Sequence, residues 1–336
     1  MATSLSSWAR TIRRTIDAAG CDGECLMREA GMDPRVLEDP HGRYPLEQTT
    51  RLWRLAVDAT GDPCLGLRVA SGVTHTTFHA LSYSLLASAT LKEAFGRIAR
   101  YFRIASDAAD THFEAHGDEY HVLIRMRPGG PQPAPEAIDA FLSVYVRMCR
   151  SVLGRDYAPR RIEMRRSRPA GGECFERILR APIVFGAPEN RLVFDRESFE
   201  RRLDSANPEL ARHNDAIVVR HLARIDRDHI GARVEAAFIE RLPQGEPSQE
   251  DIAQQLAMSP RSLQRRLADE GCSYKALLDR TRRELALSYL RDARHSVCEI
   301  TYLLGFSDTS SFTRAFRRWT GRTPTAWRTA QPESSA

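Results

Sequence analysis

The sequence of 336 residues contains no run of about 20 apolar residues, the length that a membrane-spanning helix requires. Residues 1–20 also lack the continuous apolar stretch and the cleavage site of a secretory signal. These absences lead us to expect a cytoplasmic protein that has no membrane partner. The length exceeds that of one small domain and predicts two, and a hydrophobic content of 42% suffices for a packed core in each.

Lysine is almost absent, because only Lys92 and Lys275 accompany the arginines among 49 basic residues. So one-sided a use of arginine is typical of a codon bias, and arginine abundance by itself indicates no function. The position of the charge is more informative. Residues Ser248 to Ala330 hold 14 Lys and Arg against 9 Asp and Glu, whereas the rest of the chain holds 35 of each. The excess positive charge therefore lies in the C-terminal region, as expected of a domain that binds nucleic acid.

Cysteine is scarce and scattered, with seven residues between Cys21 and Cys298. An odd and dispersed set does not form a disulfide framework, so we expect free, partly buried thiols. Cys21 and Cys25 are four residues apart, but no second close pair completes the four ligands of a zinc site. His75 and His79 share that spacing without the glutamate of a HExxH motif. The sequence therefore predicts no metal site and no cofactor.

Motifs of common catalytic sites are absent as well. The chain has no GxSxG nucleophile elbow, no P-loop and no GxGxxG phosphate cradle. We therefore expect that the protein is not an enzyme.

What the sequence does contain is a pair of helix-turn-helix patterns, of which the first runs from Ser248 to Gly271. Ser259 is suited to cap its second helix, and Pro260 fits the first helical position, where the missing N–H costs nothing. Leu263 and Leu267 are predicted to face inward. The opposite face is predicted to meet base edges with Arg261, Gln264 and Arg265.

The second pattern runs from Val297 to Gly321 and repeats this design. Gly305 ends its first helix, and Ser307 or Asp308 caps the next one. Phe312 and Phe316 are predicted to line the buried side of that helix. The residues predicted to read bases are Thr309, Ser310, Thr313 and Arg314, and those predicted to contact phosphates are Arg317 and Arg318.

The stretch from Tyr274 to Asp292 predicts one long helix between the two patterns. A stiff helix fixes the separation of two recognition helices, which is naturally about one DNA turn, roughly 34 Å. Such a spacing predicts a bipartite DNA site for each protomer. For a lone helix, an arginine-rich face would be better explained as simply solvated. Two matching helices favour DNA recognition.

The C-terminal region resembles the DNA-binding domain of the AraC/XylS family of bacterial transcription regulators. The resemblance is carried by SPRSLQRRLADEG, EITYLLGFSD, SSFTRAFRRWTG and the closing TPTAWR. It implies base-facing roles for the same residues of both recognition helices, and contacts with RNA polymerase. The family usually has Ala in place of Thr301 and Tyr or Phe in place of Trp327, changes that keep the packing role.

The N-terminal part predicts a mixed α and β domain. Gly117 lies between two alternating segments, HFEAH and YHVLIRMR, which is typical of a β-hairpin. Thr90, with Glu93 three residues on, predicts the start of a helix. Helices are predicted at 44–59, 78–87, 91–102 and 137–153, and strands at 160–165, 182–186 and 192–194, with a Pro/Gly-rich break at 128–135.

Residues 20–210 resemble the N-terminal ligand-binding domain of one branch of the family. The stretches SATLKEAFGRIARYFR, APIVFGAPENRLVFD and LDSANPEL carry this looser resemblance. The branch includes regulators of ornithine use, virulence and quorum sensing. It implies an effector-sensing and dimerising domain, without ligand-contact residues that can be transferred.

Together these features predict an α+β sensing domain at 1–214, a junction at 215–228, and an all-α double helix-turn-helix domain at 229–330. The predicted function is sequence-specific transcription regulation, with double-stranded promoter DNA, RNA polymerase, a small-molecule effector and a second copy of the chain as partners. The effector, its pocket and the sign of regulation stay open.

Two alternatives remain. One is an enzyme of the alkyl-transfer repair type fused to a DNA-binding domain, which needs a clustered cysteine quartet that this sequence does not offer. The other is a DNA binder whose N-terminal domain only dimerises.

Overall fold

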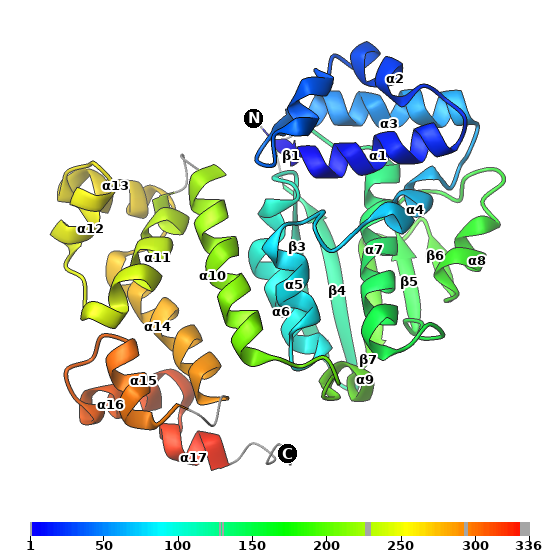
Figure 1. Ribbon diagram of the computed structural model, residues 1–336. Coiled ribbons are helices and arrows are strands. Elements are labelled where there is room, and N and C mark those ends of the chain that lie inside the picture. Colours follow the sequence, from blue (N-terminus) through cyan, green and yellow to red (C-terminus); the bar gives the residue numbers. More distant parts are fainter. Residues whose placement is uncertain (1, 128, 130, 226–229, 292–294, 330–336) are drawn as a thin grey trace. The chain divides into compact units, whose positions relative to one another are not determined.

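The computed structural model describes residues 2–127, 129, 131–225, 230–291 and 295–329. The chain divides into two compact units, Met1–Asn207 and Pro208–Ala336 (Figure 1). The predicted combination of an α+β domain and an all-α domain is confirmed. Residues 215–225 of the predicted junction lie inside one helix, and 226–228 lie outside the described residues. The domain boundaries given above stay a prediction.

A five-stranded sheet organises the N-terminal unit, with the strand order β3-β4-β7-β5-β6 (Figure 1). All its neighbours are antiparallel except β5 and β6, which are parallel. The predicted hairpin is confirmed, because His116 pairs with Glu119 across Gly117, whose φ of 56° is left-handed. The strands are β3 (Ala109–His116), β4 (Glu119–Met126), β5 (Arg161–Met164), β6 (Ile183–Phe185) and β7 (Asn190–Asp195).

Helices cover this sheet, and α7 (Pro135–Leu153) and α6 (Leu91–Tyr101) are the longest of those drawn against it (Figure 1). The Thr90 hydroxyl accepts a hydrogen bond from the Glu93 N–H at 3.1 Å, as the capping pattern predicts. An aromatic cluster holds α6 to the sheet, since the rings of Phe95 and Phe194 lie 5.5 Å apart. The remaining helices are α1 (Ser6–Ala18), α2 (Gly23–Glu29), α3 (Leu46–Thr60), α4 (Leu65–Val69), α5 (Ala80–Leu86), α8 (Cys174–Leu179) and α9 (Arg196–Glu200).

The helix predicted from Tyr44 begins two residues later, at Leu46. Tyr44 precedes a proline, and this position disfavours helical backbone. Arg43–Pro45 instead form β2, which pairs with β1 (Thr3–Leu5). The helix predicted from Phe78 likewise begins at Ala80, after His79 with a φ of 52°.

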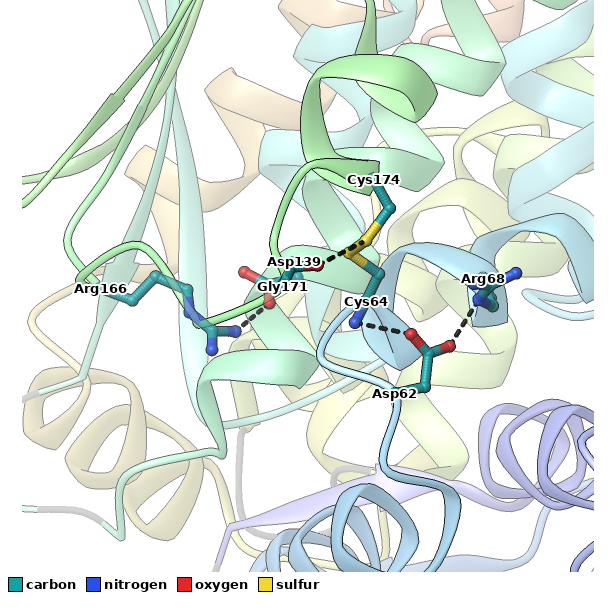
Figure 2. The surroundings of a disulfide bond; sticks show 7 residues. All are labelled: Asp62, Cys64, Arg68, Asp139, Arg166, Gly171 and Cys174. Carbon is teal, nitrogen blue, oxygen red and sulfur yellow. Dashed lines mark hydrogen bonds and ion pairs between the residues drawn. A yellow bond between two sulfur atoms is a disulfide. The ribbon is translucent and has the colours of Figure 1, made fainter.

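The expectation of free thiols is wrong for two cysteines, because Cys64 and Cys174 form a disulfide (Figure 2). Their Cα atoms are 6.4 Å apart although 110 positions separate them in the chain. Cys64 precedes α4 and Cys174 begins α8, so only the fold brings them together. Asp62 lies beside both sulfur atoms, but the disulfide leaves no thiol to bind a metal. The other five cysteines are free.

The C-terminal unit consists of helices around two small apolar cores. Leu285 of α14 packs against both cores and so joins them. The long helix predicted to reach Asp292 is observed to Leu290, and Asp292 lies outside the described residues. The helices are α10 (Pro208–Ile225), α11 (Ile230–Arg241), α12 (Gln249–Gln255), α13 (Pro260–Asp269), α14 (Tyr274–Leu290), α15 (Val297–Leu303), α16 (Thr309–Thr320) and α17 (Pro324–Thr329).

Candidate DNA-binding surface

The first helix-turn-helix is formed by α12 and α13. Ser248 and Asp251 form a reciprocal capping box at the start of α12. Ser259 caps α13 by accepting a hydrogen bond from the Ser262 N–H at 3.2 Å, and Pro260 occupies the first helical position, as predicted. Leu263 and Leu267 are fully buried. The opposite face of α13 is therefore exposed to solvent.

The second helix-turn-helix is formed by α15 and α16. Asp308, one of the two predicted caps, accepts a hydrogen bond from the Ser311 N–H at 2.8 Å. This bond and that from the Ser311 hydroxyl hold the pKa of Asp308 below its usual value, so the cap is ionised at neutral pH. Phe312 and Phe316 are fully buried, and Trp319 packs beside them.

The predicted base-facing residues occupy matching positions of α13 and α16. The second residue of each helix is Arg261 or Ser310, and the sixth is Arg265 or Arg314; all four are exposed. The fifth residue is exposed Gln264 in α13 and half-buried Thr313 in α16, and Thr309 is exposed at the start of α16. The two helices thus carry their predicted base-facing residues at the same helical positions.

Few contacts restrain these side chains. Among the described residues, none makes a hydrogen bond or ion pair to the side chains of Arg261, Gln264 or Arg265. Arg314 donates to the Ser311 hydroxyl at 3.0 Å on its own helix. The α13 side chains therefore need not give up a protein contact to bind DNA.

The two predicted phosphate contacts differ in their surroundings. Both arginines are exposed near the end of α16. Arg318 forms an ion pair at 3.2 Å with Asp279 of α14, and its guanidinium stands 6.0 Å from the Trp319 ring. Within the described part of the chain, Arg317 has no such acidic partner. Arg317 consequently offers its full charge to an incoming phosphate.

Buried Arg282 of α14 contacts the second helix-turn-helix unit of the C-terminal domain and the loop next to the first. Its Nε donates to the Leu304 carbonyl at 2.8 Å, and its Nη2 donates to the Gly305 carbonyl at 2.9 Å, both at the turn of the second unit. Nη1 pairs at 2.8 Å with Glu246, which precedes α12 of the first unit. One guanidinium thus holds the turn of the second helix-turn-helix and the loop before α12 against the connecting helix.

The backbone at this junction is closely packed. Gly305 has a left-handed φ of 70°, and a Cβ at this position would lie 2.8 Å from the Gly245 carbonyl carbon. Only glycine allows the second turn to approach the loop of the first unit so closely. This approach and the Arg282 contacts together hold the second turn against the loop that precedes α12.

Comparison with known families matches both parts of the chain. Residues 20–203 match the family described as the arabinose-binding domain of AraC transcription regulator, N-terminal, and residues 252–330 match a helix-turn-helix domain. The chain belongs to the AraC family of transcription regulators. Its C-terminal helices are accordingly a DNA-binding domain, and its N-terminal unit is a domain of the ligand-binding type.

Relatives in the AraC family extend over nearly the whole chain. The ornithine utilization regulator of Pseudomonas aeruginosa is 28% identical over 96% of this chain and 96% of its own length. The regulator VirS of Mycobacterium tuberculosis is 28% identical over 90% and 93%, respectively. The crystal structure of CdpR from Pseudomonas aeruginosa aligns over 96% of this chain and 97% of its own, with 25% identity and a TM-score of 0.48.

Thr301 and Trp327 have the packing role expected of them. Thr301 is fully buried in α15, and its hydroxyl donates to the Val297 carbonyl at 2.8 Å, so its polar atom is satisfied within the helix. Trp327 of α17 packs against the second core, with its ring 6.3 Å from that of Phe316.

The role of Arg282 was not predicted from the sequence. A signal was present, because Arg282 follows Leu278 and precedes Ala286 at four-residue spacing on the buried face of α14. A charged residue on an apolar stripe is rarely buried without a partner. Its partners here are two backbone carbonyls of a turn and the Glu246 carboxylate, and no sequence pattern predicts these contacts. Among the described helices, none is long and apolar enough to span a membrane.

Proposed function

We propose that this regulator reads a bipartite DNA site with α13 and α16 entering successive segments of the major groove. The observation that carries the proposal is that the second and sixth positions are exposed in both helices, while the fifth is exposed in α13 and half-buried in α16. Arginine and glutamine offer paired donors that match guanine and adenine edges. The proposed base-reading residues are Arg261, Gln264 and Arg265 of α13 and Thr309, Ser310, Thr313 and Arg314 of α16.

We assign phosphate binding to Arg317 and Arg318. Positive charge beside a recognition helix increases affinity for any DNA sequence and makes binding depend on salt. Arg318 binds Asp279 through one nitrogen and keeps further N–H donors, so its expected contribution is the smaller one.

Effector control and dimerisation are the second part of the proposal. The N-terminal unit belongs to a ligand-binding type, and one full-length relative is named for ornithine utilization. An effector shifts promoter occupancy only by its difference in affinity for the DNA-competent and the DNA-incompetent state. We propose a homodimer that responds in this way and contacts RNA polymerase.

Selection of bound fragments from randomised DNA with the full chain, at fixed salt, tests the DNA readout. The expected result is a motif with two half-sites about one helical turn apart. Salt-sensitive binding without any motif, both with and without candidate effectors, would contradict the proposed readout.

A further inference from the structure

A cavity in the N-terminal unit lies where α7 begins, beside the ends of three strands. Its volume is about 260 Å³, which suits a ligand smaller than a drug-sized molecule. Met126 at the end of β4 and Ile138 of α7 are among its apolar lining residues, together with Pro133 and Pro135. The polar lining residues are Gln132, Asp139, Arg165, Arg166 and Asn190.

Asp139 is the most unusual lining residue, because it is a carboxylate that is only 1% exposed. Its Oδ2 accepts a hydrogen bond from Arg166, whereas its buried Oδ1 has no hydrogen-bond partner among the described residues. Figure 2 shows the Asp139 carboxylate turned towards Arg166 and away from the disulfide. A buried carboxylate oxygen without a donor is costly, so a ligand that supplies one gains binding energy there.

The charges around Asp139 are unbalanced. Arg166 also pairs with Glu136 at 3.3 Å, so one guanidinium faces two carboxylates that are 1% and 13% exposed. Burial raises the pKa of Asp139 to about 7, while Arg166 counteracts this rise and Glu136 adds to it. A positively charged ligand group would restore the balance.

The other polar groups of the cavity are suited to an anion. Arg165 is exposed, and its guanidinium makes no hydrogen bond or ion pair to any other residue that the structure describes. Its backbone N–H donates to Asn190 Oδ1 at 3.0 Å, which leaves the amide NH₂ of Asn190 for a ligand. A guanidinium and an amide NH₂ are typical donors to a carboxylate.

We propose that this cavity binds a free amino acid, with its ammonium group on Asp139 and its carboxylate on Arg165 and Asn190. The apolar residues Met126 and Ile138 then face the side chain of the ligand. The inference rests on the proposed effector-responsive function and names the chemical class of the effector.

Thermal unfolding of the full chain with the common L-amino acids and L-ornithine, each added separately, tests the proposal. A ligand at about 100 times its Kd is expected to raise the melting temperature by roughly 5–10 °C. Analogues of the best binder that lack either the ammonium or the carboxylate are expected to give no such shift. If no amino acid gives a shift, the proposal is overturned.

Three variants locate the site. Arg165→Gln changes an exposed residue, so it should fold normally, and it is expected to weaken the bound amino acid by about 10-fold or more in Kd. Arg177→Gln is the matched control, since Arg177 is exposed and lines a different cavity. Asp139→Asn should abolish binding while the circular dichroism spectrum stays unchanged. Equal affinity in wild type and Arg165→Gln, or a loss in Arg177→Gln instead, would overturn the assignment.

DNA binding of the same preparations separates this inference from the proposed function. A protein that binds its selected DNA but no amino acid contradicts the ligand class alone. A protein that binds an amino acid but no specific DNA supports the cavity and contradicts the proposed DNA readout.

Discussion

The two helix-turn-helix units have nearly the same local design but depend on different contacts at their turns. Ala257 in the first unit and Gly305 in the second both have left-handed backbone, with φ of 56° and 70°. Ala257 is exposed, whereas Gly305 faces the Gly245 backbone. The first turn therefore accommodates a side chain with some backbone strain, and the second cannot. Equivalent turn positions thus differ in whether they leave space for a side chain.

An arginine also contacts the end of the first helix in each helix-turn-helix unit, and this contact is closer in the second unit. Arg233 of α11 donates to the Leu256 carbonyl at 3.4 Å, and Arg282 of α14 donates to the equivalent Leu304 carbonyl at 2.8 Å. Arg282 also contacts the Phe306 ring, with its guanidinium 4.2 Å from the ring centroid. The second turn is consequently the more tightly fixed of the two.

The cores give the largest expected difference. Phe316→Ala should cost about 3–5 kcal/mol, because it removes a fully buried aromatic ring from the second core. Hydrogen exchange should then show α15 and α16 opening while α12 and α13 stay protected. Leu267→Ala is the matched change in the first core and should give the opposite pattern. Unchanged protection of α16 in Phe316→Ala would refute the separate roles of the two cores.

The turns give the next effect. Gly305→Ala should cost at least about 1–2 kcal/mol from left-handed backbone alone, and more from contact with Gly245. The mirror change Ala257→Gly should stabilise the first unit by up to about 1 kcal/mol, since relief of strain exceeds the added chain entropy. Denaturant unfolding measures both. Effects of the same sign would contradict the proposed difference between the turns.

The recognition helices differ in the side chains they offer. Arg265→Ala should cost about 1–3 kcal/mol of specific binding and relax the preference at one base pair. Arg317→Ala should weaken specific and random DNA alike and flatten the salt dependence. Fluorescence anisotropy on selected and scrambled DNA at several salt concentrations measures both. Equal losses on the two DNAs for both variants would end the division into base-reading and phosphate-binding residues.

The helix caps give the smallest expected effect, which is a difference between α13 and α16 in stability at acid pH. Hydrogen bonds from Ser311 lower the pKa of Asp308, so its stabilising contribution is present above its ordinary pKa of 3.8 and is lost as pH falls through the lower folded-state pKa. Ser259 at the same place in α13 does not titrate. NMR amide signals of α16 should therefore change in acid before those of α13. Asp308→Asn should remove the difference.

The first helices of the two units provide the control for that titration. Asp251 of α12 and Glu299 of α15 complete the capping boxes begun by Ser248 and Ser296, and hydrogen bonds from these two serines lower the pKa of each carboxyl. Acid should therefore loosen α12 and α15 alike. A difference between these two helices that matched the one between α13 and α16 would point to a cause other than the caps.

Features that depend on residues close to one another in the chain could be predicted from the sequence. Ser259, Asp308 and Thr90 act as caps because their partners lie three residues away, and the hairpin at Gly117 forms because its strands are adjacent. The same holds for the exposed faces of α13 and α16, since helical periodicity alone decides which side chains share a face.

Contacts between distant segments of the chain became known only from the folded structure. The disulfide links cysteines 110 positions apart, and Arg282 meets Glu246 across 36 positions. Asp139 is buried beside Arg166 in the folded protein, and its Oδ1 is left without a hydrogen-bond partner among the described residues. Local propensity carries no information about such encounters, because they depend on how whole elements pack to bury their apolar faces.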